Sequence, residues 1–312
     1  MAGAEHGTKA VVVALCANLA IAVAKFVGFL LTGASSMLAE SVHSVADSGN
    51  QGLLLFGGKS ARRAATVEHP FGYARTRYFW SFVVAVVLFA LGSLFSLFEG
   101  VHKLAHPEPL RSLTIAVIIL CVAIALEGYA FTTAVGQANH TRGMQSWWGF
   151  IRHSKSPELP VILLEDFGAL VGLVLALVGL GLATLTGQPA WDAYATLAIG
   201  TLLGVIATVL AVEMKSLLIG EAASTRDLEQ IRAAITGTPN VVDLIHVKTQ
   251  HLGPDELLVA AKVRLDPSLS FNEVVATIDA AERTVRETVP AATVMYIEPD
   301  IEPDIEAAPQ PA

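Results

Sequence analysis

One imidazole and three carboxylates stand where they could bind a metal ion. His43 and Asp47 are four residues apart in "SVHSVAD", so on a helix they share one face, about one turn apart. Glu165 and Asp166 are adjacent in "VILLEDFGALVG". One nitrogen and several oxygen ligands suit Zn²⁺, with Mn²⁺, Fe²⁺ or Co²⁺ as alternatives. On spacing alone, His43 and Asp47 could equally be a hydrogen-bonded pair that only fixes helix packing.

These side chains belong to a strongly apolar chain. Its 312 residues are 53% hydrophobic and 15% charged, and the mean hydropathy is +0.57. The apolar residues form runs of about twenty or more, the length that a membrane-spanning helix needs. A charged side chain at the centre of such a helix costs about 2.5–3.5 kcal/mol, so each one needs a partner or a function. The sequence therefore predicts an integral membrane protein.

Six transmembrane helices are predicted, at residues 10–32, 36–57, 79–101, 112–136, 161–185 and 191–213. Most Lys and Arg residues between the spans follow the second and the fourth, which places both termini in the cytoplasm. Lys25 in the first span is expected to pair with an acid or to extend toward the membrane surface. Glu127 in the fourth span is expected either to form a structural pair or to transfer protons.

Near residue 222 the long apolar runs end, and the sequence takes on the mixed polar and apolar pattern of a water-soluble domain. Ser224 and Ser270 each begin a helix, "VVDLIHVKTQHL" and "ELLVAAKVRL" form a hairpin, and "ATVMYIEP" is a last strand. The order αββαβ predicts a ferredoxin-like α+β domain. The predicted division is a membrane domain at 1–221, a cytoplasmic domain at 222–300 and a disordered tail at 301–312, which is rich in Pro and acid.

Several functions are disfavoured. The net charge of −8 comes largely from the last hundred residues and argues against a nucleic-acid partner. Cys16 and Cys121 lie in apolar runs and are expected to be core residues. No HExxH motif is present, so we do not expect a membrane metalloenzyme. A metal sensor would use the soluble domain as its main site, yet that domain has few candidate ligands.

The sequence resembles the cation diffusion facilitator family of divalent-metal/proton antiporters. The resemblance is carried by "GASSMLAESVHSVADSGNQGLLLFG", "HPFGYARTRYFWS", "WDAYATLAIGTLLG" and "LLIGEA". It implies a homodimer that moves Zn²⁺ or a related ion out of the cytosol in exchange for protons, with no cofactor besides the transported ion. It also implies that His43, Asp47 and Asp166 are ligands.

The departures from the family pattern are specific. Many members have His or Asp four residues before the fifth-span Asp, where this chain has Ile162, so Glu165 is a candidate for the missing oxygen ligand. The pair of Glu165 and Asp166 resembles the Glu-Asp pair found in one branch of the family. A second metal site in the loop after the second span is expected to be absent, because Tyr73 replaces a His. Tyr296 replaces the His of the last strand, so we expect at most weak metal binding in the cytoplasmic domain.

The expected mechanism follows from the chemistry of the candidate ligands and from the family resemblance. Cytosolic metal binds His43, Asp47 and Asp166, and Glu165 or water completes the shell. Because the ligands bind metal only when deprotonated, protons on the other side displace the ion. The expected location is a bacterial inner membrane, because no Arg-rich, Ser-rich segment precedes the first span.

Overall fold

The computed structural model describes residues 18–107 and 109–300. Expectations for residues 10–17 of the first span, for Cys16 and for the tail 301–312 lie outside this part of the chain. The structure forms two compact units, each considered by itself below. The first comprises residues up to Arg63 together with Thr76–Lys215, and the second comprises Ala64–Arg75 together with Ser216 onward.

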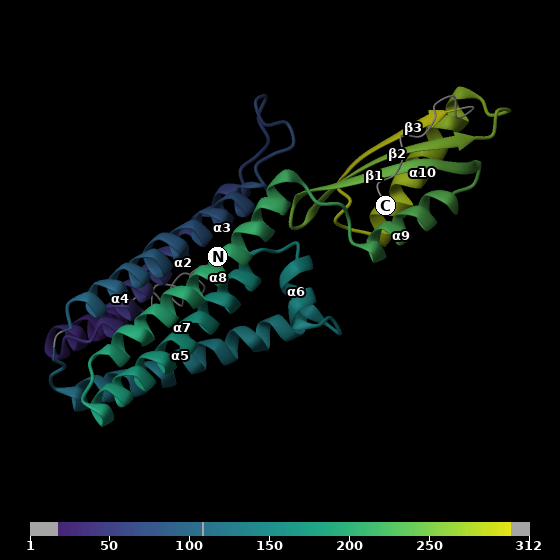
Figure 1. Cartoon of the computed structure of the whole chain (residues 1–312). Helices are drawn as coiled ribbons and strands as arrows, with labels where there is room; N and C mark the ends of the chain where they lie inside the picture. Colours follow the sequence, from purple (N-terminus) through teal and green to yellow (C-terminus); the bar gives the residue numbers. More distant parts are fainter. Residues whose placement is uncertain (1–17, 108, 301–312) are drawn as a thin grey trace, which may run out of the picture. The chain divides into compact units, whose positions relative to one another are not determined.

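The first unit is a bundle of long helices (Figure 1). The helix Asn18–Thr32 is followed by α2 (Ser35–Ala61), α3 (Thr76–Val87), the π-helical η1 (Leu88–Leu94), α4 (Phe95–Ala105), α5 (Leu113–Arg142), the short α6 (Trp147–His153), α7 (Glu158–Thr186) and α8 (Ala190–Ile219). Among the described helices, four are long and apolar enough to cross a membrane: the continuous helix of α3, η1 and α4, and α5, α7 and α8. The helix α2 has the length but is richer in serine and ionisable residues.

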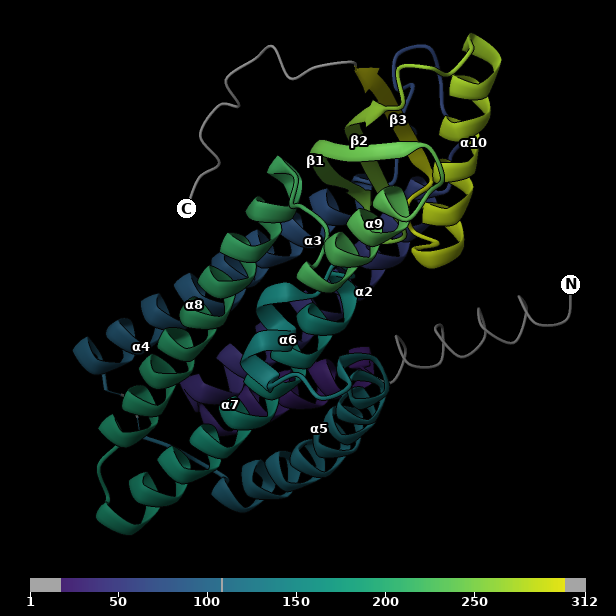
Figure 2. The same cartoon turned by 90° about the vertical axis from the view of Figure 1, so that its right-hand side faces the viewer.

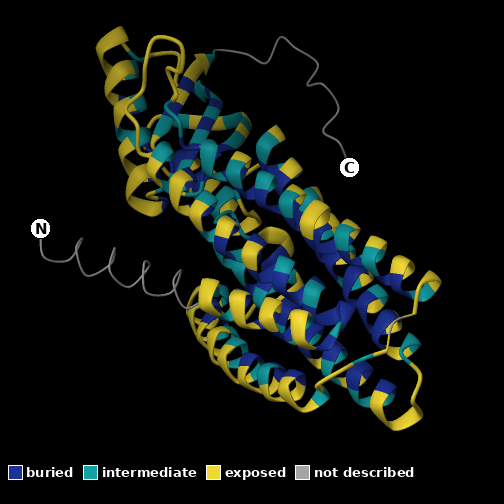
Figure 3. Cartoon of the chain, turned by 90° about the vertical axis from the view of Figure 1, so that its left-hand side faces the viewer, coloured by how far each residue is buried: buried dark blue, intermediate teal, exposed yellow. Residues whose placement is uncertain are grey.

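The second to sixth predicted spans correspond to α2, α3 through α4, α5, α7 and α8. All five continue past the predicted ends: α2 to Ala61, α4 to Ala105, α5 to Arg142, α7 by one residue to Thr186, and α8 to Ile219. The prediction followed the apolar runs, whereas the helical backbone continues through polar residues of good helix propensity, such as Lys59 and Lys215. Exposed residues line the outer faces of the bundle and buried ones lie between its helices (Figure 3).

Small residues let the helices of the bundle approach closely. A β-carbon on Gly200 of α8 would lie 2.9 Å from the backbone nitrogen of Leu97 on α4, and one on Gly100 would lie 2.7 Å from Cγ of Leu197. A β-carbon on Gly179 of α7 would lie 2.4 Å from Cβ of Ala195 on α8. Such close packing holds helices together in a bilayer, where apolar burial from water cannot.

A buried carboxylate joins the beginnings of two helices. Asp192, in the first turn of α8, accepts hydrogen bonds from the backbone nitrogen of Ser35 at 2.7 Å and from its hydroxyl at 2.9 Å. It also accepts from the nitrogen of Ser36 at 3.4 Å and from the Ser36 hydroxyl. The amide groups at the start of a helix have no partner within the helix and attract negative charge. Asp192 therefore caps α2 from a neighbouring helix.

The second unit contains α9 (Thr225–Thr236), β1 (Val241–Gly253), β2 (Glu256–Leu265), α10 (Phe271–Thr288) and β3 (Val294–Asp300). The strand order is β1-β2-β3, with β2 antiparallel to β1 and parallel to β3 (Figure 2). Alternate residues of β2 are buried, and they share one core with residues from both helices. Both helices therefore cover the same face of the sheet. The predicted αββαβ domain is confirmed.

Both predicted helix starts of this unit are also confirmed. The Ser224 hydroxyl accepts a hydrogen bond from the backbone nitrogen of Asp227 at 3.1 Å. Ser270 and Glu273 form a complete capping box. Hydrogen bonds from the hydroxyl and the backbone nitrogen of Ser270 hold the pKa of Glu273 below its usual value.

We expect Asp192→Ala to destabilise the protein, because four donors at the start of α2 would lose their acceptor inside the bundle. The loss should be about 1–3 kcal/mol, the range for a buried polar group left without a partner. Thermal unfolding of the detergent-purified protein measures it. Asp192→Asn, which keeps one acceptor oxygen, is the matched control and should lose less. An alanine variant as stable as the wild type would contradict the capping role.

Candidate metal site

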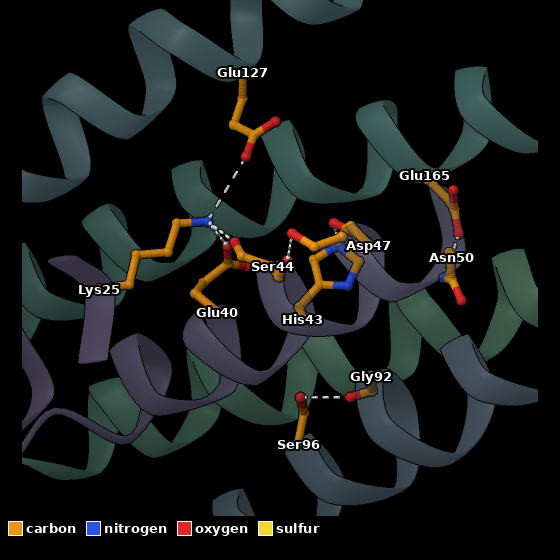
Figure 4. A network of polar contacts seen from close by, with 11 residues as sticks. Lys25, Glu40, His43, Ser44, Asp47, Asn50, Gly92, Ser96, Glu127 and Glu165 are labelled. Carbon is orange, nitrogen blue, oxygen red and sulfur yellow. Dashed lines mark hydrogen bonds and ion pairs between the residues drawn. The ribbon is translucent and has the colours of Figure 1, made fainter. Parts of the chain in front are cut away.

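Four polar residues of α2 lie on one face of the helix. Glu40, His43, Asp47 and Asn50 follow one another at spacings of three, four and three residues, the spacing of a single helical face. Glu40, His43 and Asn50 are fully buried, and the side chain of Asp47 is 15% exposed. Figure 4 shows these side chains along one side of α2. The second span therefore carries a polar stripe through the interior of the bundle.

His43 and Asp47 form the centre of this stripe. Nε2 of His43 lies 3.5 Å from Oδ2 of Asp47, which is too long for a firm hydrogen bond. Within the described part of the chain, neither ring nitrogen of His43 nor Oδ1 of Asp47 has a hydrogen-bond partner. Buried polar atoms ordinarily have one. A tight pair that only fixes helix packing does not explain these open positions, whereas a bound cation would use them.

The two adjacent acids of α7, Glu165 and Asp166, differ in their surroundings. Glu165 is buried, and its Oε1 accepts a hydrogen bond from Nδ2 of Asn50 at 2.6 Å (Figure 4). Asp166 is half-buried. The carboxylates of Glu127, Glu165 and Asp166 all act electrostatically on Asp47, and the ammonium group of Lys25 opposes them. With three acids against one base, a cation beside Asp47 is favoured.

The predicted ligands are not assembled into a coordination shell. Over residues 18–107 and 109–300, no group of three or more His, Cys, Asp or Glu side chains is close enough to hold a metal ion. His43 and Asp47 are brought together, but Glu165 is held by Asn50. The ligand set of His43, Asp47, Asp166 and Glu165 therefore stays a prediction.

The helix that faces His43 is distorted. Residues Leu88–Leu94 form a π-helix between α3 and α4, a rare conformation that often occurs at functional sites. Gly92 lies in this segment, and a β-carbon on it would be 3.8 Å from Nδ1 of His43. The Ser96 hydroxyl donates to the Gly92 carbonyl at 2.6 Å (Figure 4). The π-helix was not predicted from the sequence, and it places Gly92 close to the imidazole of His43.

A buried lysine forms ion pairs with two further acids beside the candidate site. Nζ of Lys25 lies 3.2 Å from Oε2 of Glu40 and 3.9 Å from Oε1 of Glu127, and it donates to the Ser44 hydroxyl at 2.7 Å. The expectation that Lys25 pairs with an acid is confirmed, and Glu127 is one of its partners. Glu40 was missed, although its place three residues before His43 puts it on the same helical face.

The sheet of the second unit offers few ligands for a metal. Tyr296 is 60% exposed, and His251 is buried with Nδ1 3.2 Å from the carbonyl oxygen of Gly253. On the same sheet, Nζ of Lys262 lies 2.6 Å from Oδ2 of Asp300 and 3.8 Å from Oε1 of Glu298. The hydrogen bond to Asp300 raises the pKa of Lys262. The acids of the last strand therefore already have a cationic partner.

We expect Asn50→Leu to destabilise the first unit, because it leaves Glu165 as a buried carboxylate without its donor. The free energy of unfolding should fall by about 1–3 kcal/mol. Glu165→Gln is the matched single variant, and Asn50→Leu/Glu165→Gln should recover part of the loss because position 165 then carries no charge. Thermal unfolding of all four proteins gives the coupling. Strictly additive losses would show that the two side chains do not stabilise each other.

Comparison with known proteins identifies the family. Residues 11–219 match the cation efflux transmembrane domain, and residues 223–300 match the cytoplasmic domain of cation efflux proteins. The chain is 33% identical over 261 residues to the human mitochondrial proton-coupled zinc antiporter SLC30A9, covering 83% of this chain and 46% of the relative. The chain thus spans about half the length of that relative.

Two further relatives are matched over a larger share of their own length. Metal tolerance protein C4 of Arabidopsis thaliana is 29% identical over 285 residues, which are 91% of this chain and 61% of the relative. Magnetosome protein MamB of Paramagnetospirillum magneticum is 23% identical over 281 residues, 89% of each chain. Since the family models match nearly all the described residues, the chain is a member of the cation efflux family, with a multi-pass helical membrane domain followed by a cytoplasmic domain.

Proposed function

We propose that this protein exports a divalent transition-metal cation, foremost Zn²⁺, from the cytosol in exchange for protons by alternating access. The observation that carries the proposal is the buried pair of His43 and Asp47, whose open nitrogen and oxygen atoms face no partner among the described residues. The names of the SLC30A9 relatives, which describe proton-coupled zinc antiporters, support the same function.

The chemistry of the site favours a borderline metal ion. One imidazole with two or three carboxylates matches the ligands that Zn²⁺ accepts in tetrahedral sites, and Mn²⁺, Fe²⁺ and Co²⁺ accept the same set. We assign His43, Asp47 and Asp166 as ligands, with Glu165 or water in the fourth position. Glu165 now accepts a hydrogen bond from Asn50, so its use as a ligand requires that bond to be exchanged for the metal.

Proton exchange follows from the nature of the ligands. An imidazole and a carboxylate bind a metal ion only in their deprotonated forms, so metal and protons compete for the same lone pairs. A side that is richer in protons therefore releases the ion, and the protonated ligands carry protons back. The cluster of acids around Asp47 makes the empty site a strong acceptor of either cation.

The assembly and the location belong to the same proposal. The cytoplasmic domain of this family implies dimerisation, and we propose a homodimer with domain limits at 1–221 and 222–300. Both termini would be cytoplasmic, because Lys and Arg cluster in the loops after α2 and α5. We propose a bacterial inner membrane, although the SLC30A9 relatives are named as mitochondrial. Membrane fractionation of the source cells distinguishes the two.

His43→Ala and Asp47→Ala should each reduce Zn²⁺ efflux from proteoliposomes by at least about tenfold, because a four-ligand site that loses one strong ligand binds Zn²⁺ poorly. Asp166→Asn should have an effect of that size, and Glu165→Gln a smaller one. Size-exclusion profiles and unfolding temperatures control for folding. Wild-type efflux in a folded His43 or Asp47 variant would exclude the site. An indispensable Glu165 beside a dispensable Asp166 would reverse the choice of ligand.

Metal efflux should depend on a proton gradient. In inside-out vesicles loaded with a pH-sensitive dye, added Zn²⁺ should enter while protons leave, and a protonophore should slow the accumulation. The reason is the competition of metal and protons for His43 and the acids around it. Asp47→Ala vesicles provide the control for leaks. Zn²⁺ entry without proton movement, or entry that a collapsed gradient leaves unchanged, would make the protein a uniporter or channel.

A further inference from the structure

Lys25 is a fully buried cation held by oxygen atoms from two neighbouring helices. Glu40 and Ser44 contribute from α2, and Glu127 contributes from α5 (Figure 4). An ammonium group has three donors and no acceptor, and three oxygens surround Nζ at 2.7, 3.2 and 3.9 Å. The oxygens therefore define a small cage for a cation, and at present an ammonium group on a side chain occupies it.

The carboxylates of the cage carry more negative charge than the single positive charge of Lys25 balances. One carboxylate is enough to pair one buried ammonium, yet Glu40 and Glu127 both face Nζ, which leaves a formal charge of −1. Excess negative charge inside a membrane is costly and calls for a function. Two carboxylates and a hydroxyl form an all-oxygen set, the kind that a divalent cation accepts.

The position of Glu40 provides a second, independent observation. Its Oε2 faces Lys25, but its Oε1 is buried and has no hydrogen-bond partner within the described residues. A β-carbon on Gly172 of α7 would lie 2.3 Å from that oxygen. Gly172 thus leaves space for a carboxylate oxygen that nothing in the described protein satisfies.

The cage is adjacent to the candidate metal site. Glu40 precedes His43 by three residues on α2, a rise of about 4.5 Å along the helix. Ser44 follows His43 directly. With the orientation proposed above, the first residues of α2 lie on the side opposite the cytosol. An ion that leaves His43 and Asp47 for that side would meet Glu40 next.

On the basis of the proposed export function, we propose that Glu40, Glu127 and Ser44 form a second cation site, which the transported divalent ion occupies in transit and which the Lys25 ammonium occupies in its absence. The Lys25 ammonium then competes with the ion and promotes its release. The oxygen atoms surround Nζ at ammonium distances, so binding a metal ion at about 2–2.5 Å requires the carboxylates to move inward.

The first test counts bound Zn²⁺ in the full-length, detergent-purified chain by equilibrium dialysis, at the free Zn²⁺ concentration that just fills the His43 and Asp47 site of the wild type. Lys25→Met removes the competing charge and keeps the length of the side chain, so it should bind one more Zn²⁺ per chain than the wild type. Lys25→Met/Glu40→Gln removes the second site as well and should return to the wild-type number. Any metal on the cytoplasmic domain is common to all variants. Lys103→Met, which removes a buried lysine that donates to the Gly33 carbonyl at 2.8 Å, is the matched control and should bind as the wild type does.

The second test measures efflux and does not require a folded Lys25→Met protein. Lys25→Arg keeps the charge, but its planar fork can hold both carboxylates at once, so the ion should displace it poorly. Efflux should slow by about tenfold while the number of bound ions stays the same. Glu127→Gln leaves the pair of Lys25 and Glu40 intact and should also slow efflux. A lysine that only ties helices together predicts near-normal efflux in Lys25→Arg, which leaves the acids around Asp47 unchanged.

The outcomes separate this inference from the proposed function. An unchanged Zn²⁺ count in folded Lys25→Met overturns the second site, and so does wild-type efflux in both Lys25→Arg and Glu127→Gln. If the wild-type protein shows no Zn²⁺ efflux at all, the proposed function fails instead. The Zn²⁺ count still decides in that case whether Glu40 and Glu127 bind a cation.

Discussion

The cost of placing a charge in the hydrocarbon interior determines how the membrane unit is organised. Each ionisable group there needs a partner, because water is not available to solvate it. Asp192 meets this requirement with donors at the start of α2, and Glu165 meets it with Asn50. Leaving one partner of such a buried hydrogen-bonded pair unsatisfied costs about 1–3 kcal/mol. These pairs hold particular helices in particular positions, whereas apolar contacts with lipid or protein discriminate little between arrangements.

His43 and Asp47 meet this requirement less fully than Lys25 and Glu165 do, which is why we propose that they bind the transported ion. Both ring nitrogens of His43 and Oδ1 of Asp47 lack a hydrogen-bond partner among the described residues. A protein that binds its cargo only transiently must keep a site that is stable enough when empty and not so stable that the cargo cannot enter. Neighbouring acids make the empty site attractive to a cation.

The sequence was sufficient to predict the fold class and the elements that carry the site. Long apolar runs predicted the spans. In the second domain, the spacing of apolar residues predicted the helices, and Ser224 and Ser270 predicted where they begin. The spacing of His43 and Asp47 placed them on one face, because helical periodicity is local. What could not be predicted depends on other helices. The π-helix opposite His43, the cap that Asp192 supplies across the bundle and the engagement of Glu165 by Asn50 all arise from tertiary contacts.

Glu40 shows where local reasoning could have gone further. Its place on the polar face of α2 follows from the same periodicity that singled out His43 and Asp47, so its burial beside them was within reach of the sequence. Its partner was not, because Lys25 lies on another helix and Glu127 on a third. Lysines neutralise acids in both units, Lys25 in the membrane and Lys262 on the sheet. Water stabilises the carboxylates beside Lys262 whether or not the lysine is present, so that ammonium is not needed to hold them. Lys25 and Glu40 are fully buried, so the ammonium or another cation has to balance the two acids whenever both are charged.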